Sequence, residues 1–321
     1  MAASAPLILV TGATGFVGRA LCEALVARGY AVRAATRNPS TPQAAVEPCV
    51  VGDIGPHTEW SQALRGADAV VHLAARTHVL HDTVDNPLHE YRRSNTEATA
   101  RLATAAARAG VRRFVYTSSI KVNGERTTAQ PYTAEDTPRP EDAYGTTKWE
   151  AERALRAVEK HTGMEAVILR PPLVYGPGVK ANFLRLMQLV ARGVPLPLAA
   201  IDNRRSMLYL GNLVDALCLC LSAPDAAGKT YLVSDGRDLS TPDLVRALAQ
   251  ALGVRPRLFA VPVGVLAAGA ALFGQRARID RLTNSLQVDS TPLREELGWQ
   301  PPYSVEQALA LTAQWWRAQR G

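Results

Sequence analysis

The chain has 321 residues, of which 47% are hydrophobic and 20% are charged, and its formal net charge is +7. This composition is typical of a soluble globular protein that is long enough for one large domain or two moderate ones. The basic residues are scattered and form no Lys/Arg run of the kind found in nucleic-acid-binding tails, so the positive charge suits an anionic small ligand better than DNA.

The cysteines and histidines predict neither a disulfide framework nor a metal site. The chain has no CxxC motif, and its four cysteines are expected to be free thiols in a reducing cytosol (Cys22, Cys49, Cys218 and Cys220). His78 and His81 are three residues apart, but no third ligand stands at a usual spacing, so a loop or pocket role is expected for them.

Two segments indicate whether the protein is expected to be secreted or inserted in a membrane. The segment 1–6 lacks the basic start and the cleavage site of a signal peptide. The most apolar segment, 261–273, is far shorter than the ~20 residues that a membrane span needs, and it is expected to form a buried helix. We therefore expect a cytoplasmic protein with no membrane insertion and no nucleic-acid partner.

The first predicted elements form a dinucleotide-binding turn. A continuously apolar strand over 6–10 leads into the loop Thr11-Gly12-Ala13-Thr14-Gly15-Phe16-Val17-Gly18, and a helix over 19–28 follows. Glycines let the backbone approach a pyrophosphate, and the N-terminus of a helix favours an anion. The expected cofactor contacts in this loop are Gly12, Thr14, Gly15, Phe16, Val17 and Gly18.

The second predicted strand, 31–35, ends at Thr36 and Arg37. In an NAD-binding unit this strand end usually carries an Asp or Glu that holds the ribose hydroxyls, and here there is none. Thr36 and Arg37 could instead accept the 2′-phosphate of NADP, whereas the alternative is a surface arginine in a loop. This interpretation favours NADP(H) as the cofactor and leaves NAD(H) open.

Strands and helices then alternate along the chain, which predicts an α/β fold with a doubly wound parallel sheet of the Rossmann type. The expected strands cover 49–51, 69–73, 113–116 and 166–169, and the helices between them cover 86–108 and 144–161. Further helices are expected over 182–192, 241–252, 261–273 and 304–320, while 208–222 and 230–233 are expected to return to the main sheet.

The character of the sequence changes at Arg170, where a proline-rich loop begins. We therefore predict two interleaved domains. The NAD(P)-binding Rossmann domain comprises 1–170 and 206–236. The smaller C-terminal substrate-binding domain comprises 171–205 and 237–321.

Tyr144 and Lys148 are four residues apart and therefore share one face of the predicted helix. A phenol holds its proton until about pH 10, and a nearby ammonium lowers that pKa by favouring the phenolate. Such a tyrosine can give or take a proton near neutrality, although the pair alone is also common on solvated helix faces. Ser119 follows the apolar run 113–116, and with the glycine loop these residues predict a hydride-transfer site.

With these motifs the sequence resembles the extended short-chain dehydrogenase/reductase superfamily, in its sugar-nucleotide epimerase/dehydratase branch. The resemblance covers nearly the whole chain. It rests on Gly12-x-x-Gly15-x-x-Gly18, Asp53-Ile54, His72-Leu73-Ala74-Ala75, Asn95, Ser119, Tyr144-x-x-x-Lys148, Arg170-Pro171 and Leu297-Gly298-Trp299.

The resemblance implies a role for each matching residue. Tyr144 is the acid–base residue, Lys148 holds the nicotinamide ribose and tunes Tyr144, and Ser119 bonds the sugar oxygen that becomes a carbonyl. The implied cofactor contacts outside the glycine loop are Thr36, Arg37, Asp53, Ile54, Leu73, Ala74, Ala75, Asn95, Tyr144, Lys148 and Pro171. The implied contacts with a UDP-sugar substrate are Thr77, His78, Ser119, Asn182 and Arg205.

The sequence departs from the family pattern at three places. Dehydratases follow the catalytic Ser or Thr with Asp-Glu, whereas Ile120-Lys121 stands here, so dehydration is not expected. Leu173 stands where galactose epimerases carry an Asn. The late arginine that binds the diphosphate is not evident, and either Arg278 or Arg281 could replace it.

The run 118–125 is most similar to enzymes of bacterial surface-polysaccharide synthesis that are labelled UDP-glucose 4-epimerase-like. Some of these reduce a UDP-4-keto-6-deoxy-N-acetylhexosamine to UDP-N-acetylquinovosamine, and this reduction is the main hypothesis. The alternative is a UDP-glucose/UDP-N-acetylglucosamine 4-epimerase, which would use the same residues. A non-catalytic dinucleotide-sensing protein fits less well, because such proteins usually lose the Tyr and the Lys.

The resemblance also implies a homodimer, in which the helices over 86–108 and 144–161 pair with their copies. Small residues would permit close approach of these helices, and the candidates are Ala98, Ala105, Ala151 and Ala154. The alternative is that these residues pack within one subunit.

Overall fold

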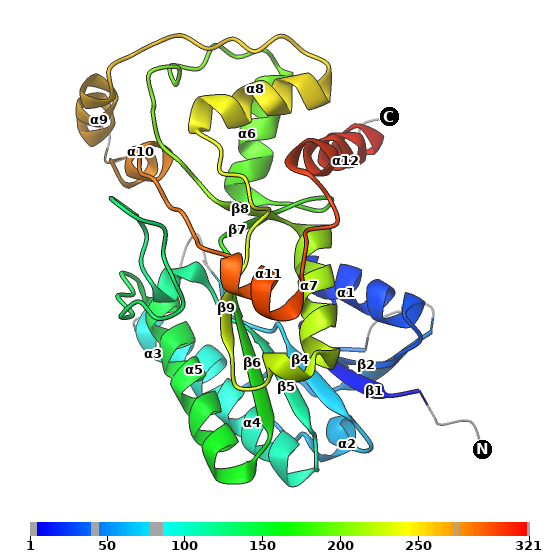
Figure 1. The fold of residues 1–321 in the computed structure, drawn as a ribbon. Helices are drawn as coiled ribbons and strands as arrows, with labels where there is room; N and C mark the ends of the chain where they lie inside the picture. The colour runs from blue at the N-terminus through cyan, green and yellow to red at the C-terminus, as the bar shows by residue number, and fades with distance from the viewer. Residues whose placement is uncertain (1–4, 40–44, 78–85, 273, 275, 320–321) are drawn as a thin grey trace.

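A computed structural model describes residues 5–39, 45–77, 86–272, 274 and 276–319 of the chain. Its centre is a seven-stranded sheet whose strands all run parallel, in the order β3-β2-β1-β4-β5-β6-β9 (Figure 1). The strands are β1 (Leu7–Thr11), β2 (Ala31–Thr36), β3 (Val46–Val50), β4 (Ala69–His72), β5 (Arg113–Thr117), β6 (Glu165–Arg170) and β9 (Thr230–Leu232). The order reverses between β1 and β4, and ligands of such sheets bind at this point, beyond the carboxyl ends of the strands.

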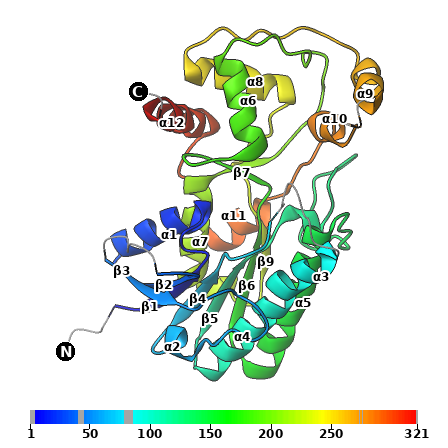
Figure 2. The same ribbon diagram turned by 180° about the vertical axis from the view of Figure 1, so that it is seen from behind.

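Helices cover both faces of this sheet, which confirms the predicted Rossmann architecture (Figures 1 and 2). One face carries α1 (Phe16–Ala27) and α7 (Leu210–Ser222), and the other carries α4 (Ala98–Arg108) and α5 (Ala143–Thr162), with the short α2 (Ser61–Leu64) beside α4. An apolar core lies under each helical layer, and the inner strands β1, β4, β5 and β6 are buried on both sides as continuous apolar runs predict, whereas the edge strand β3 is partly exposed.

A second lobe stands above the carboxyl ends of the strands (Figure 1). It holds a two-stranded parallel sheet, β7 (Leu173–Tyr175) and β8 (Met207–Tyr209). Its apolar core is shared by α6 (Ala181–Ala191), α8 (Thr241–Leu252) and α12 (Val305–Ala318). The helices α9 (Val263–Leu272) and α10 (Arg276–Thr283) lie against each other at the rim of this lobe.

The last part of the chain returns to the main sheet through α11 (Thr291–Leu297). Leu293 and Trp299 join the core beneath α1 and α7, and the Trp299 indole donates a hydrogen bond to Asp215 (3.1 Å). Residues 237–321 therefore contribute to both cores, while the two-domain division itself stays a prediction.

The segment 208–222 was predicted to return to the main sheet, and most of it does so as a helix that covers one face of that sheet. In the structure β8 pairs with β7 in the small sheet, and α7 covers one face of the main sheet, so that only β9 extends that sheet. The apolar run of α7 has 13 residues, which is too long for an ordinary strand and is compatible with a buried helix.

The predicted helix over 86–108 consists of three pieces. These are α3 (Pro87–Tyr91), a π-helical turn over Arg92–Glu97, and α4. Single π-helical turns are rare and occur frequently at functional sites. Here the turn carries Asn95, whose side chain is buried.

The prediction that 261–273 forms a buried helix is wrong for the described side chains. In α9, Val265 is 60% exposed and Val263 is 37% exposed. The residues of α9 are apolar on every side, so the pattern selects no face for burial, and the lobe core is already filled by α6, α8 and α12. No helix among the described residues is long and apolar enough to cross a membrane.

Two of the four alanines proposed for a dimer interface lie inside the subunit. Ala98 and Ala151 are fully buried, and Ala151 belongs to the core between α4, α5 and the sheet. Ala105 and Ala154 are half-buried and remain on accessible faces of α4 and α5. The alternative of packing within one subunit therefore holds for the first pair.

Candidate active site

The start of α5 presses against the loop that follows β5. Asp142 caps the helix by accepting a hydrogen bond from the Gly145 backbone N–H (2.7 Å). A Cβ atom on Gly145 would lie 2.6 Å from the Lys121 carbonyl oxygen, so only glycine allows this approach. Lys121 also pairs with Asp142 (2.5 Å), which fixes the first turn of α5 next to Ser119.

Ser119, Tyr144 and Lys148, predicted from widely separated positions, lie together. The Ser119 hydroxyl lies close enough to the half-buried Tyr144 to lower the pKa of its phenol. The Lys148 Nζ lies 5.9 Å from the centre of the Tyr144 ring and donates a hydrogen bond to the Thr117 carbonyl (2.8 Å). A phenol, a hydroxyl and an amine are thus gathered at the carboxyl end of β5.

The charges in this cluster differ from the expectation of an acidified tyrosine. Burial, with a smaller effect from Asp142, raises the pKa of Tyr144 well above its usual value, and the hydrogen bond with Ser119 opposes that rise. Burial also lowers the pKa of Lys148 to about 7, although the nearby carboxylate of Glu152 acts in the opposite direction. Lys148 is therefore a weak source of positive charge at neutral pH.

A buried ion pair stands beneath Lys148. Arg170 binds both carboxylate oxygens of Glu152 (3.0 and 2.6 Å), and the Ser118 hydroxyl donates to the same carboxylate (2.5 Å). Arg170 also donates a hydrogen bond to the side-chain oxygen of Asn123 (3.0 Å). These bonds fasten α5 to β6 and to the loop that carries Ser119. Glu152 was not among the predicted site residues, although it follows Lys148 by four positions on the same helix face.

His72 at the end of β4 was also not predicted as a site residue. The Thr11 hydroxyl accepts hydrogen bonds from the next two backbone N–H groups after His72 (both 3.2 Å) and lies 2.6 Å from His72 Nδ1. The Thr99 hydroxyl donates its hydrogen to the Asn95 carbonyl (2.5 Å), so toward His72 Nε2 (3.0 Å) this hydroxyl can only accept. Nε2 of His72 therefore carries the proton, and Nδ1 accepts a hydrogen bond from the Thr11 hydroxyl. Burial, helped by Lys148, lowers the pKa of His72 to about 3, which keeps it neutral.

The glycine loop fits a dinucleotide. A Cβ on Gly12 would lie 2.9 Å from the Ala74 nitrogen, and one on Gly18 would lie 2.1 Å from the Gly12 carbonyl oxygen. Helix α1 begins at Gly15 with no side-chain cap and no acid in its first turn, so its N–H groups are left for an anion. The other predicted contacts follow the loop, with Thr14 exposed and Phe16 and Val17 half-buried.

The ends of β2 and β3 meet at the predicted ribose position. Arg37 forms an ion pair with Asp53 (2.7 Å), and both side chains are exposed. The Thr36 hydroxyl is buried and has no hydrogen-bond partner among the described residues. The end of β2 itself carries no acid, as the sequence indicates, and the predicted cofactor residue Asp53 from the loop after β3 lies directly beside Arg37.

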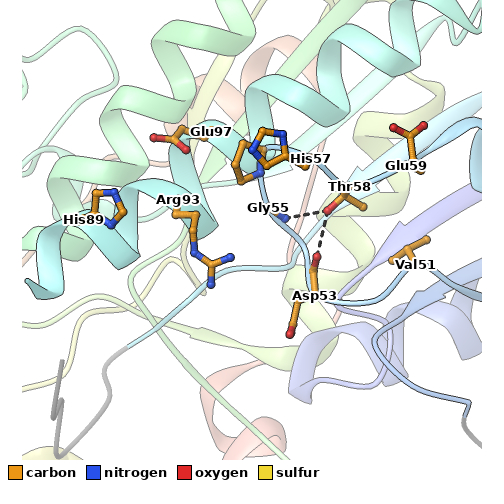
Figure 3. A pocket seen from close by; sticks show the side chains of 10 residues that line it. Val51, Asp53, Gly55, His57, Thr58, Glu59, His89, Arg93 and Glu97 are labelled. Carbon is orange, nitrogen blue, oxygen red and sulfur yellow. Dashed lines mark hydrogen bonds between the residues drawn. The ribbon is translucent and has the colours of Figure 1, made fainter.

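Asp53 also lines a cavity of about 510 Å³ (Figure 3). Thr58 accepts a hydrogen bond from the Gly55 N–H (2.8 Å) and donates one to the Asp53 carbonyl (3.0 Å), which closes the turn carrying Asp53. The lining residues are Val51, Asp53, Gly55, Pro56, His57, Thr58, Glu59, His89, Arg93 and Glu97. Asp53 alone among them belongs to the predicted site, and its neighbour Ile54 is half-buried outside this lining.

The remaining predicted cofactor residues surround the loop after β4. Leu73, Ala74 and Ala75 are half-buried along that loop. Asn95 exchanges two hydrogen bonds with the Arg76 backbone (2.7 and 3.1 Å) and donates a third to Thr147 (3.1 Å), which ties the loop to α5.

Pro171 directly follows β6 and is buried. Its carbonyl accepts a hydrogen bond from the Ile120 N–H (3.0 Å), one residue after Ser119. The end of β6 is therefore joined to the loop that carries Ser119, beside the predicted catalytic group.

The predicted substrate residues are more dispersed. Thr77 is exposed at the end of the β4 loop, and His78 lies outside the described residues. Asn182 is exposed in the first turn of α6, directly after Ala181, whose φ of 53° is unusual for a residue other than glycine. Arg205 is half-buried, and its Nη1 donates to the carbonyls of Arg281 and Asn284, on either side of the end of α10 (3.0 and 2.9 Å).

Comparison with known proteins gives a consistent result. Residues 8–234 match the model of the NAD dependent epimerase/dehydratase family. The chain is similar to a UDP-glucose 4-epimerase of Vibrio cholerae, with 45% identity over 310 residues that cover 96% of this chain and 94% of that protein. It is 28% identical to an N-acetyl-alpha-D-glucosaminyl-diphospho-ditrans,octacis-undecaprenol 4-epimerase of Escherichia coli O157:H7, over 96% of this chain and 94% of that protein.

Solved structures share the fold. MoeE5 in complex with UDP-glucose and NAD matches with a TM-score of 0.77 at 28% identity, covering 98% of this chain and 99% of that one. A UDP-N-acetylglucosamine 4-epimerase from Bacillus cereus matches with a TM-score of 0.80 at 22% identity, covering 99% of this chain and 100% of that one. The chain therefore belongs to the NAD-dependent epimerase/dehydratase family, within the extended short-chain dehydrogenase/reductases, and is an enzyme that uses a nicotinamide dinucleotide.

Proposed function

We propose that this chain is a UDP-hexose 4-epimerase that works with Tyr144, Ser119 and Lys148. The observation that carries the proposal is the placement of Ser119 beside Tyr144, with Lys148 one turn further along α5 and the glycine loop at a nearby strand end. The similarity to the Vibrio cholerae 4-epimerase, over nearly the full length of both chains, supports the epimerase alternative more than the 4-keto reductase that the sequence first suggested.

The chemistry at C4 divides between the cofactor and the protein. The bound nicotinamide supplies a hydride acceptor that later returns the hydride to the sugar. Tyr144 takes the proton of the C4 hydroxyl as the carbonyl forms and gives it back after the keto sugar has turned. Ser119 would donate a hydrogen bond to the C4 oxygen, and Lys148 would hold the cofactor ribose.

Several residues of this chain would hold the dinucleotide. The N–H groups at the start of α1 would face the pyrophosphate, and the orphaned Thr36 hydroxyl would meet the ribose of the adenosine half. Because Asp53 already forms an ion pair with Arg37, a 2′-phosphate would have to displace the Asp53 carboxylate. We therefore expect NAD(H) to bind at least as tightly as NADP(H), which reverses the preference drawn from the missing acid at the end of β2.

One observation keeps the 4-keto reductase as a second candidate. Leu173 on β7 is 47% exposed at the base of the second lobe and presents an apolar side chain where a galactose epimerase has an amide. An apolar contact suits the methyl group of a 6-deoxy sugar. The substrate contacts implied by the resemblance, with Asn182 and Arg205 on the UDP part, would be the same for both reactions.

The deciding experiment uses two reactions of the purified protein. The epimerase interconverts UDP-glucose and UDP-galactose, or their N-acetyl forms, without added reduced cofactor, and NMR identifies both sugars. If those pairs stay unchanged and a UDP-4-keto-6-deoxy-N-acetylhexosamine consumes NADPH or NADH stoichiometrically, the reductase is the function. Cofactor binding without turnover of any of these sugars would contradict both.

A further inference from the structure

The helix α9 is an apolar element on the surface of the second lobe. Its ten residues are all Val, Leu, Ala or Gly. Val265 is 60% exposed and Val263 is 37% exposed, and Phe259, which precedes the helix, is 48% exposed. Figures 1 and 2 show α9 at the outer edge of the lobe beside α10, on the side away from α12. A helix that is apolar on every side is normally buried in protein or lipid.

The segment that leads from α8 into α9 and α10 is rich in arginine. Residues 244–279 contain no Asp or Glu. The same segment holds five arginines, at positions 246, 255, 257, 276 and 278. Arg255 and Arg257 are exposed, and neither guanidinium forms an ion pair within the described part of the chain. By contrast, the exposed arginines 237 and 246 in the same lobe pair with Glu306 and Asp243. We call Phe259, Val263, Val265, Arg255 and Arg257 the α9 patch.

The base of the α9 patch is held in place by backbone hydrogen bonds. The Arg257 carbonyl accepts from the Leu196 N–H (2.8 Å), and the Phe259 N–H donates to the Leu196 carbonyl (3.1 Å). The Phe259 carbonyl accepts from the Ala199 N–H (3.1 Å). The exposed ring and the two arginines are therefore presented on a fixed strand-like segment rather than on a free loop.

We propose that the α9 patch docks on an anionic lipid bilayer, with α9 lying in the interface. Apolar side chains that enter the boundary of the acyl chains, flanked by arginines that meet anionic headgroups, are the features that hold helices at such interfaces. Ten residues are too few to span the ~30 Å hydrocarbon core, so α9 would lie on the membrane and not cross it. Docking would place the second lobe at the membrane surface.

A second copy of the chain is the less favoured occupant. A two-fold contact through the α9 patch would bring Arg255 and Arg257 of both copies into one interface without a carboxylate from residues 244–279 to pair them. A bilayer with anionic lipids supplies the missing negative charge. The proposal does not rest on the sugar substrate, so its failure would leave the assignment as a 4-epimerase untouched.

The test is sedimentation of the full-length protein with vesicles of phosphatidylcholine, with and without phosphatidylglycerol. We expect binding to the anionic vesicles that weakens with salt. Val265→Asp should weaken it by at least about tenfold, because it places a charge in the interface. Arg255→Gln/Arg257→Gln should weaken it by about fivefold for each arginine. The control Val50→Asp changes a valine that is 50% exposed on β3, far from α9, and should bind like the wild type.

Thermal unfolding of each variant checks that the chain is folded before binding is compared. The proposal is wrong if the folded wild type does not sediment with anionic vesicles, or if Val265→Asp binds as well as Val50→Asp. It is also wrong if light scattering shows a wild-type dimer that Val265→Asp converts to a monomer while vesicles have no effect, because the α9 patch then belongs to a second copy.

Discussion

Replacing Glu152 by glutamine tests whether the buried pair beneath Lys148 holds the active site together. Arg170 makes two hydrogen bonds to the Glu152 carboxylate, and both side chains are almost wholly buried. The glutamine amide is neutral, so the Arg170 charge would lose its counter-charge. The NH₂ group of the amide would also face a group that donates a hydrogen bond to the Glu152 carboxylate in the wild type. Removing one partner of a buried pair costs about 3–5 kcal/mol, so Glu152→Gln should lose about that much free energy of unfolding in urea.

The matched control is Glu150→Gln on the same helix. Glu150 pairs with Arg92 at the surface, and exposed pairs contribute about 0–1 kcal/mol. Equal losses for the two variants would refute the idea that the Glu152–Arg170 pair is a buried structural charge pair. A double variant, Glu152→Gln/Arg170→Met, should recover part of the loss because it no longer buries an unpaired charge.

The same substitution should also change the pH dependence of turnover. Burial lowers the pKa of Lys148 to about 7, and the Glu152 carboxylate opposes that effect. Without the carboxylate the pKa of Lys148 falls further. If a step needs the Lys148 ammonium, the decline of turnover on the alkaline side should therefore begin at a lower pH in Glu152→Gln than in the wild type. An unchanged alkaline limb in folded Glu152→Gln would show that the charge on Lys148 does not limit turnover.

Three further predictions concern the cofactor, the proton and the subunits. Tyr144→Phe removes the transferable proton and should reduce turnover by ~10²–10⁴ with cofactor binding retained in a fluorescence titration, and near wild-type turnover would contradict the assignment. Asp53→Asn frees Arg37 and should improve NADPH binding relative to NADH, whereas Arg37→Ala should weaken NADPH more; calorimetry that gives equal changes for both cofactors would argue against a phosphate contact. A homodimer through α4 and α5 should be weakened by Ala105→Glu or Ala154→Glu in light scattering, and a wild type that stays monomeric at micromolar concentration would exclude it.

The fold was predictable because its signals are local. The inner strands β1, β4, β5 and β6 are short, mostly apolar runs, and the glycine loop marks the turn between β1 and α1. The failure comes from a segment whose pattern does not select a partner. In α9 every side is apolar, and only the filled core of the second lobe decides that it stays outside.

The candidate site was predictable to the extent that spacing and strand ends define it. Tyr144 and Lys148 share a helix face, and Ser119 follows a strand that ends beside them. The hydrogen bonds of His72 instead join Thr11 and Thr99, which lie 61 and 27 positions away in the sequence. No local pattern records such contacts.

The pairing of Arg37 with Asp53 shows the same limit at the cofactor site. The two residues follow different strands, and they meet because β2 and β3 are neighbours in the parallel sheet. Reading the end of β2 alone gave an arginine without an acid, and that absence pointed to NADP. The three-dimensional arrangement restores an acid next to the arginine, so the argument from its absence loses its basis.

The charges around Tyr144 connect the fold to the proposed two-step reaction. Burial keeps His72 neutral, brings the pKa of Lys148 to about 7, and raises the pKa of Tyr144, while the Glu152–Arg170 pair carries no net charge. In this setting Tyr144 holds its proton and is ready to donate it. An added positive charge beside the ring would lower the pKa of Tyr144 and make it a base. Of the two proton steps proposed for Tyr144, return of the proton to the sugar fits this setting directly, whereas removal of the proton from the C4 hydroxyl requires such a lowering of the pKa of Tyr144.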